Sequence, residues 1–418
     1  MADAVTHWND VLLEVVKNVG GAPGPIARGG AMMHGAIYDA VNSIRPSTHR
    51  PYLVSVPALP GTSVRAAIAH AAHDTLVAAF PTQAALITVE RDTAIQALPQ
   101  TNNVSRGEVV GKAAAQAMIE ARAGDGADDM KPYVSGNQAG DWRPTDANPA
   151  ATPTWPSVKP FGIPAGNAFR PPRPGGYGSK TEMLQSIEYA AQFNDVKRLG
   201  RFDATVSGNR SPEQEEIAFF WANDLDGTYK PPGQLFEITK IVSEQKGLDI
   251  VDNARLFALV ALAMADAGVV AWDAKYETSL DLWRPETAIK EAANDGNPAT
   301  TPDGSWKPLS RKGPPDMTRF SPPFPAYISG HATFGAAHAA IMRRFFGTDN
   351  VTFTARTDDP NAPGVTRTFD SFTQAALENA RSRIYLGVHF QWDGDHGFLS
   401  GTALAEYIYD NVLTPIGS

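Results

Sequence analysis

The segment from residue 257 to residue 272 constrains the fold most, because it is apolar around its whole circumference if helical. Asp266 is its only ionisable residue. A helix that is hydrophobic on every side must be surrounded by the rest of the chain. The segment is shorter than the roughly 20 residues that cross a bilayer. We therefore expect a buried core helix in a soluble protein, with no membrane span.

Helical patterns cover most of the remaining sequence. Residues 8–16 place apolar side chains three and four positions apart, and residues 31–42, 63–80 and 105–123 are rich in alanine, which favours helices. Seven further helices are expected at residues 180–199, 212–223, 235–246, 252–276, 329–346, 371–385 and 398–412. This pattern predicts an all-α fold.

Residues 125–178 differ in character from the segments on either side. They contain ten prolines, which exclude a long helix, and interleaved aromatic residues, which usually pack. We expect an ordered, irregular segment that wraps a helical body. The domain prediction is an N-terminal bundle with this wrapping segment over residues 1–178, and a C-terminal bundle that carries the functional site over residues 179–418.

Charge and cysteine content exclude several functions. The chain has 36 Lys and Arg against 45 Asp and Glu, a formal net charge of −9, and no basic run. This argues against a nucleic-acid or anionic-membrane binder. The absence of cysteine excludes thiol catalysis and cysteine-ligated metals. The N-terminal sequence lacks a basic and apolar leader, so we expect a cytoplasmic protein.

Three segments of the second half collect residues that are costly to bury. They carry a cation set, a Ser-Gly-His turn at a predicted helix start, and two histidines, one of them followed by an aspartate four residues later. The residues are Lys275 and Arg284, then Ser329, Gly330 and His331, then Arg383, His389 and Asp393. Guanidinium groups and a helix N-terminus suit an oxyanion. Asp393 can accept a hydrogen bond from one ring nitrogen of His389 and leave the other nitrogen free.

These segments resemble the three-part signature of the type-2 phosphatidic acid phosphatase and vanadium haloperoxidase superfamily. Residues 169–172, 196–200 and 211–221 are similar to its bacterial vanadium-dependent haloperoxidase branch. The resemblance implies two bundles of the four-helix type that hold vanadate. It implies that His389 binds vanadium, that His331 is the acid/base, and that the vanadate oxygens are held by Lys275, Arg284, Ser329, Gly330 and Arg383.

The implied reaction uses hydrogen peroxide to oxidise a halide to hypohalous acid, which halogenates a small organic substrate. Lys275 would polarise the peroxide. Trp272 and Phe324 fall where chloroperoxidases of the family have their halide pocket, so we expect use of bromide and extension to chloride. The Lys–Arg spacing is two residues longer than the family's, and Ile328 stands where the family has proline.

Other interpretations compete with this one. The same cradle suits an acid phosphatase in which His389 becomes a phosphohistidine. An iron site could use His331 with His338, or His389 with Asp393 and His396, although the nearby cations would repel a metal cation. A helical scaffold with a decayed site is a third alternative. The family includes monomers and larger assemblies, so a homo-oligomer is left open.

Overall fold

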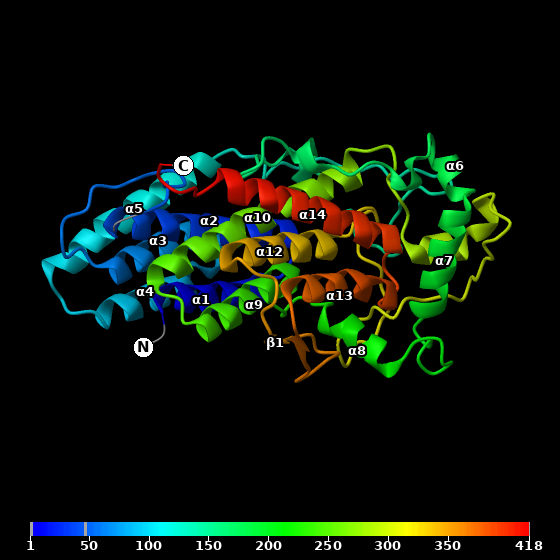
Figure 1. The fold of residues 1–418 in the computed structure, drawn as a ribbon. Helices are drawn as coiled ribbons and strands as arrows, with labels where there is room; N and C mark the ends of the chain where they lie inside the picture. Colours follow the sequence, from blue (N-terminus) through cyan, green and yellow to red (C-terminus); the bar gives the residue numbers. More distant parts are fainter. Residues whose placement is uncertain (1–2, 46–47, 418) are drawn as a thin grey trace.

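The computed structural model describes residues 3–45 and 48–417 as an elongated helical body (Figure 1). The predicted all-α class is confirmed. The described residues add one antiparallel hairpin, in which β1 (Phe353–Arg356) pairs with β2 (Thr366–Phe369). Its strands have four residues each, too short for a clear alternating pattern. The expectation about a leader concerns the N-terminal sequence, whose first two residues, Met1 and Ala2, lie outside the described residues.

Helix α10 (Ile250–Tyr276) is the centre of the molecule, as the apolar segment predicts. It begins at Asp249, whose carboxylate accepts the backbone N–H groups of Val251 and Asp252. It packs against α2 (Pro23–Ile44) and against α12 (Gly330–Phe346). Among the described helices it alone has the length and hydropathy of a membrane span, and 94% of its most apolar window is buried inside the protein.

The other N-terminal helices lie with α2 at one end of the body (Figure 1). They are α1 (Ala4–Val19), α3 (Val64–Ala79), the 3₁₀ turn η1 (Pro81–Gln83), α4 (Ala84–Gln96) and α5 (Asn102–Arg122). The sequence predicts all but η1 and α4. Ile87 is the one buried residue of α4, so that helix has no apolar stripe to reveal it.

The remaining helices make up the C-terminal part of the chain. They are α6 (Lys180–Leu184), α7 (Ile187–Leu199), α8 (Pro212–Phe220), α9 (Lys230–Lys246), α11 (Pro285–Lys290), the 3₁₀ turn η5 (Ala292–Asn294), α13 (Phe372–Tyr385) and α14 (Gln391–Asn411). The single helix predicted for residues 180–199 is wrong, because Ser186 caps the start of α7 with its hydroxyl and ends the preceding helix. Helix α14 begins seven residues before the predicted start.

The wrapping segment is confirmed as ordered and irregular. Its regular structure consists of η2 (Trp155–Ser157), η3 (Gly166–Phe169) and η4 (Pro174–Gly176). Asp266 of α10 accepts the backbone N–H groups of residues 161, 162 and 163 at 2.6, 2.7 and 2.9 Å. Arg170 donates to Asp273 of α10 at 2.5 Å. These contacts explain why a carboxylate interrupts the apolar core helix. The division of the chain at residue 178 stays a prediction.

Candidate oxyanion site

The predicted site residues converge where the C-terminal ends of α10 and α13 meet the N-terminal end of α12. A cavity of about 880 Å³ opens there. Six of these residues line it: Trp272, Phe324, Gly330, His331, Arg383 and His389. Four others lie behind the lining: Lys275, Arg284, Ser329 and Asp393, each fully buried. Residues from three separated segments thus form one site.

Ser329 caps the start of α12 directly behind the cavity lining. Its Oγ accepts the backbone N–H of Ala332 at 3.3 Å, and its own N–H donates to the carbonyl of Asp393 at 2.9 Å. A Cβ on Gly330 would lie 3.3 Å from the ring of Trp272, so glycine allows this close approach. The free amides and the positive dipole end of α12 favour an anion at this place.

His389 lies in the short link between α13 and α14. Its Nδ1 lies 3.0 Å from Oδ2 of Asp393, and its Nε2 lies 3.0 Å from Nη1 of Arg284. Asp393 Oδ2 also accepts the N–H of Phe390. Because Arg284 can only donate, Nε2 carries the lone pair and Nδ1 carries the hydrogen. Burial, followed by the charge of Arg284, lowers the pKa of His389 well below its usual value, so the ring is neutral.

Gly387 makes this link possible. Its φ of +81° is in the left-handed region, and a Cβ there would lie 2.4 Å from the carbonyl oxygen of Gly200. A side chain at this position would push the backbone of residues 387–389 away from α7. Glycine therefore sets the position from which His389 reaches the cavity.

Arg284 and Arg383 carry the buried positive charge. Arg284 donates from Nε to the carbonyl of Phe324 at 2.8 Å and from Nη1 to that of Val388 at 2.8 Å, and its buried Nη2 has no partner. Buried Nε and Nη1 of Arg383 also have no partner. Burial lowers the pKa of Arg284 to about 9. Unpaired buried guanidinium hydrogens indicate a site that an oxyanion completes.

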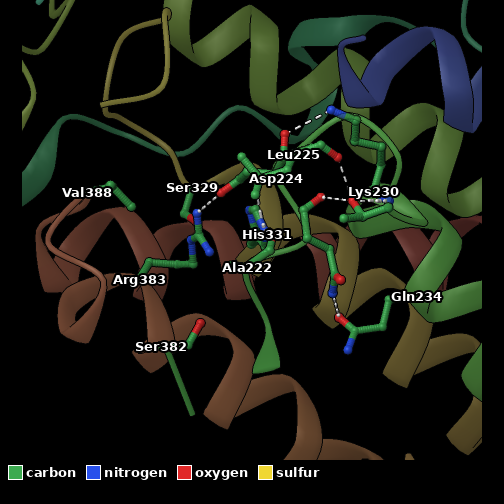
Figure 2. Close-up of polar contacts among 12 residues, drawn as sticks. Ala222, Asp224, Leu225, Lys230, Gln234, Ser329, His331, Ser382, Arg383 and Val388 are labelled. Carbon is green, nitrogen blue, oxygen red and sulfur yellow. Dashed lines mark hydrogen bonds and ion pairs between the residues drawn. The ribbon is translucent and has the colours of Figure 1, made fainter. Parts of the chain in front are cut away.

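Arg383 uses its remaining nitrogen for Asp224, a residue that the sequence analysis missed. Figure 2 shows the Arg383 side chain directed at this carboxylate, and Nη2 lies 2.7 Å from Oδ2. Burial alone would raise the pKa of Asp224, but the charge of Arg383 and its hydrogen bond lower it below its usual value. Asp224 follows α8 within a loop and belongs to no motif, so only its place after a predicted helix end could have drawn attention to it.

His331 is held by the same loop. Its Nε2 lies 2.9 Å from the carbonyl oxygen of Ala222, to which it donates, and 3.9 Å from Oδ1 of Asp224 (Figure 2). The Nδ1 atom is therefore the one that can take up a proton. Burial and then the charge of Arg383 lower the pKa of His331 to about 4. The ring is neutral at neutral pH and can act as a base.

Lys275 does not reach the cavity. Its ammonium donates to the carbonyl oxygens of Pro325, Ala326 and Ile328 at 2.7, 3.1 and 2.5 Å, which uses all three hydrogens. Burial and then the charge of Arg284 lower its pKa well below the usual value. Lys275 thus binds the segment that leads into Ser329.

Trp272 and Phe324 form one apolar wall of the cavity. Their ring centroids lie 5.0 Å apart, and the Trp272 Nε1 donates to the carbonyl of Ala151 at 3.3 Å. The Arg284 guanidinium lies 4.7 Å from the Phe324 ring centre. The two residues therefore lie together beside the cradle, and their role in halide binding stays a prediction.

The iron alternative has no support in the residues that the structure describes, among which no three His, Asp or Glu side chains come together as metal ligands. His338 instead bonds to the hydroxyl of Thr239 at 3.0 Å, and His396 bonds to that of Tyr327 at 2.6 Å. The cluster around the cavity combines cations, neutral histidines and a helix N-terminus. Fold and site together define an all-α protein with a buried oxyanion cradle.

Comparison with known proteins shows which proteins this chain is similar to. Residues 255–417 match the family model described as the VCPO second helical-bundle domain. The chain is 34% identical over 264 residues to vanadium chloroperoxidase from Curvularia inaequalis, a match that covers 50% of this chain and 42% of that protein's length. The chain thus spans less than half the length of that relative, and the match to the family model is confined to residues 255–417.

Two solved structures share the fold of the whole chain. A bacterial vanadium-dependent iodoperoxidase superimposes with a TM-score of 0.82 and 24% identity, covering 98% of this chain and 97% of the other. The holo-type structure of a bacterial vanadium-dependent chloroperoxidase superimposes with a TM-score of 0.71 and 17% identity, over 94% and 93% of the two chains. The expected likeness to bacterial vanadium haloperoxidases is confirmed at the level of the fold.

Proposed function

We propose that this protein is a vanadate-dependent haloperoxidase that uses hydrogen peroxide to oxidise bromide and chloride to hypohalous acid. The observation that carries the proposal is the set of unpaired, buried guanidinium nitrogens on Arg284 and Arg383, beside the neutral ring of His389. An anion with several oxygens would satisfy these donors, and a cation would be repelled by them. The residues present therefore fit vanadate.

The chain's own residues would divide the work as follows. Arg284, Arg383 and the amide of Gly330 would hold the oxygens of vanadate. Nε2 of His389 would supply a bond to vanadium after Nη1 of Arg284 turns from this nitrogen to a vanadate oxygen. Asp393 holds the hydrogen on Nδ1 of that ring, so the lone pair stays on Nε2. Bound vanadate supplies a Lewis acid that activates hydrogen peroxide toward halide without changing its own redox state.

His331 would handle the proton. Its Nε2 hydrogen is engaged by Ala222, so Nδ1 is the atom that accepts a proton from peroxide and returns it to the departing oxygen. Its neutral state at neutral pH follows from its pKa of about 4. The indole and phenyl rings of Trp272 and Phe324 keep this part of the cavity apolar, which lowers the competition of water with the halide.

Lys275 would act indirectly in this scheme. Its three bonds hold residues 325–328, which lead into the cap of α12 and so place Ser329 and Gly330. Lys275 makes these bonds in a chain whose spacing between Lys275 and Arg284 is two residues longer than the family's. Direct contact of Lys275 with peroxide, which the family resemblance implies, would require it to give up at least one of these carbonyl partners.

The test is a halogenation assay on chelator-treated protein, with peroxide and either bromide or chloride, before and after orthovanadate is added. Activity that appears only with vanadate and is lost in His389→Ala supports the proposal. Lys246→Ala, which changes an exposed residue at the end of α9 outside the cavity, is the control. Hydrolysis of a phosphomonoester that vanadate inhibits, without halogenation, would show the alternative acid phosphatase.

A further inference from the structure

The cavity above the cradle is much larger than the reaction with halide requires. Its volume is about 880 Å³, whereas a water molecule in the liquid occupies about 30 Å³. Vanadate, peroxide and a halide together need only a small part of it. Pockets for drug-sized ligands span about 300–1,000 Å³. The remaining space has the size of an organic molecule.

The wall of the cavity is apolar and rigid. Seven of its described lining residues are prolines, which have fixed backbone angles and no N–H to donate. Phe320, Phe324, Phe334 and Leu225 add rings and an alkyl side chain between the cradle and the opening. A preformed wall of this kind favours a flat, apolar body such as an aromatic ring.

The polar groups nearer the opening are mainly acceptors. Asp146, Asp226 and Asp316 line it, and the two lysines among its lining residues are already paired. Lys230 lies 2.7 Å from Asp226, and Lys312 lies 3.2 Å from Asp316. Asp226 and Asp316 are thus neutralised by these lysines, and Asp146 leaves the mouth with a net negative charge. The mouth disfavours an anionic organic molecule and suits one with O–H or N–H donors.

We propose that this cavity binds the organic halogen acceptor itself, an electron-rich aromatic molecule that is neutral or cationic, directly above the oxyanion cradle. This inference rests on the proposed function. Peroxide, bromide and a proton give hypobromous acid and water. Hypobromous acid then replaces a ring hydrogen by bromine, and the displaced proton combines with the departing hydroxide to form a second water. The bromine transfer occurs inside the cavity.

The experiment uses three phenols with the same ring and different charges: tyramine, 4-ethylphenol and 3-(4-hydroxyphenyl)propionate. Calorimetry on the full chain, with orthovanadate present to fill the cradle and peroxide absent, measures their binding at pH 7. We expect the anion to bind about tenfold more weakly than the other two, a factor that corresponds to roughly 1.4 kcal/mol. Asp146→Asn should reduce the ratio of the affinity for tyramine to the affinity for 3-(4-hydroxyphenyl)propionate. Glu14→Gln, which changes an exposed carboxylate on α1, should leave this ratio unchanged.

Two wall variants test the place of binding. Phe320→Ala removes a ring from the wall and Leu225→Trp fills space, so both should weaken binding of 4-ethylphenol about tenfold. Phe202→Ala, which removes a ring outside the cavity, should not. Bromide oxidation without a phenol, followed as tribromide, should stay within about twofold in all three variants, since none of them belongs to the cradle.

The products provide an independent readout. The enzyme with vanadate should give a ratio of mono- to dibrominated 4-ethylphenol that differs from that of reagent hypobromite and shifts in Phe320→Ala. Equal binding of the three phenols, or a product ratio identical to that of hypobromite, would overturn the inference. Absence of bromide oxidation with preserved binding of phenols would instead overturn the proposed function, so the two failures are distinguishable.

Discussion

At the scale of single residues, the site is organised by how each buried charge is satisfied. Lys275 has three carbonyl partners, whereas the guanidinium groups of Arg284 and Arg383 keep unpaired nitrogens. A buried donor without a partner costs about 1–3 kcal/mol. All hydrogens of the lysine ammonium are therefore bonded within the protein, whereas the two arginines keep N–H donors that suit a ligand. This difference separates the role of Lys275 from that of the arginines.

The role of Asp393 gives a prediction about vanadate binding. In Asp393→Asn the side-chain amide can donate to Nδ1 of His389 and move the ring hydrogen onto Nε2, which removes the lone pair that the metal needs. We expect the vanadate affinity, measured by equilibrium dialysis, to fall about 10–100-fold. Asp395→Asn, an exposed change two residues later, is the control. Affinity that is unchanged or higher would mean that net charge dominates.

Lys275 gives a prediction about stability without any ligand. Lys275→Met leaves the carbonyl groups of Pro325, Ala326 and Ile328 without their donor. We expect the free energy of unfolding in urea, without vanadate, to fall by roughly 1–3 kcal/mol. Lys312→Met, at the exposed mouth, should change it by less than about 0.5 kcal/mol. A more stable Lys275→Met would mean that the buried ammonium is a net cost, as expected of a group reserved for a ligand.

At the scale of elements, close packing of α14 on α12 aligns the two halves of the cradle. A Cβ on Gly397 would lie 2.9 Å from the carbonyl oxygen of Ser329, and one on Gly401 would lie 2.3 Å from that of Thr333. Glycine at these two positions lets the helices approach with their backbones nearly in contact. The cap of α12 and the aspartate at the start of α14 are thereby brought together.

This contact gives a matched pair of substitutions on one helix. Gly401→Ala would place a methyl group into the backbone of α12, and we expect a loss of about 1–3 kcal/mol in the free energy of unfolding. In Gly394→Ala the new Cβ would meet the carbonyl oxygen of Ala380 at 3.4 Å, an ordinary contact. Its stability should be equal or higher, since alanine favours helix. Equal losses in both variants, measured by urea unfolding, would contradict this packing argument.

At the scale of the whole molecule, one carboxylate couples the wrapping segment to the core helix. Asp266 is fully buried, and its two oxygens accept three backbone N–H groups of residues 161–163. Burial raises its pKa from 3.8 to about 6, although the three hydrogen bonds act in the opposite direction. The folded state therefore holds a proton on Asp266 more tightly than the unfolded chain does.

The sign of the resulting pH dependence follows from this difference. The contribution of Asp266 to stability is fully present below pH 3.8 and declines as the pH rises to about 6, because the charged form is disfavoured by burial. Two pKa units correspond to about 3 kcal/mol. Asn does not titrate, so the stability of the wild type relative to Asp266→Asn should fall by up to that amount from pH 4 to pH 7.

Urea unfolding of both proteins across this pH range measures the difference. Taking the difference cancels the opposite contribution of buried histidines such as His34 and His338, whose pKa values burial lowers to about 3. A pH-independent difference would show that Asp266 is ionised at the same pH in the folded and unfolded chains. Asp252→Asn, which alters a less buried carboxylate of the same helix, serves as the comparison.

The sequence by itself determined the helical class, the central position of the apolar helix and the composition of the cradle. These properties depend on local patterns, because side-chain spacing shows which face of a helix is buried, and three short segments hold ten site residues. Helix α4 was not predicted, because only one of its residues is buried and its sequence therefore shows no apolar face. The start of α14 was missed because its first turns, residues 391–396, contain a single large apolar residue, Trp392, and so show no apolar stripe.

Only the tertiary structure decided how the charges are distributed among partners. Asp224 lies 159 positions from Arg383 in the chain, and Lys275 lies 50 to 53 positions from the carbonyl oxygens that it binds. No local pattern relates such residues, because hydrogen-bond partners are chosen by proximity in space. The cavity above the cradle has the same origin. Its walls come from loops whose paths depend on packing, and their paths determine which molecule can enter.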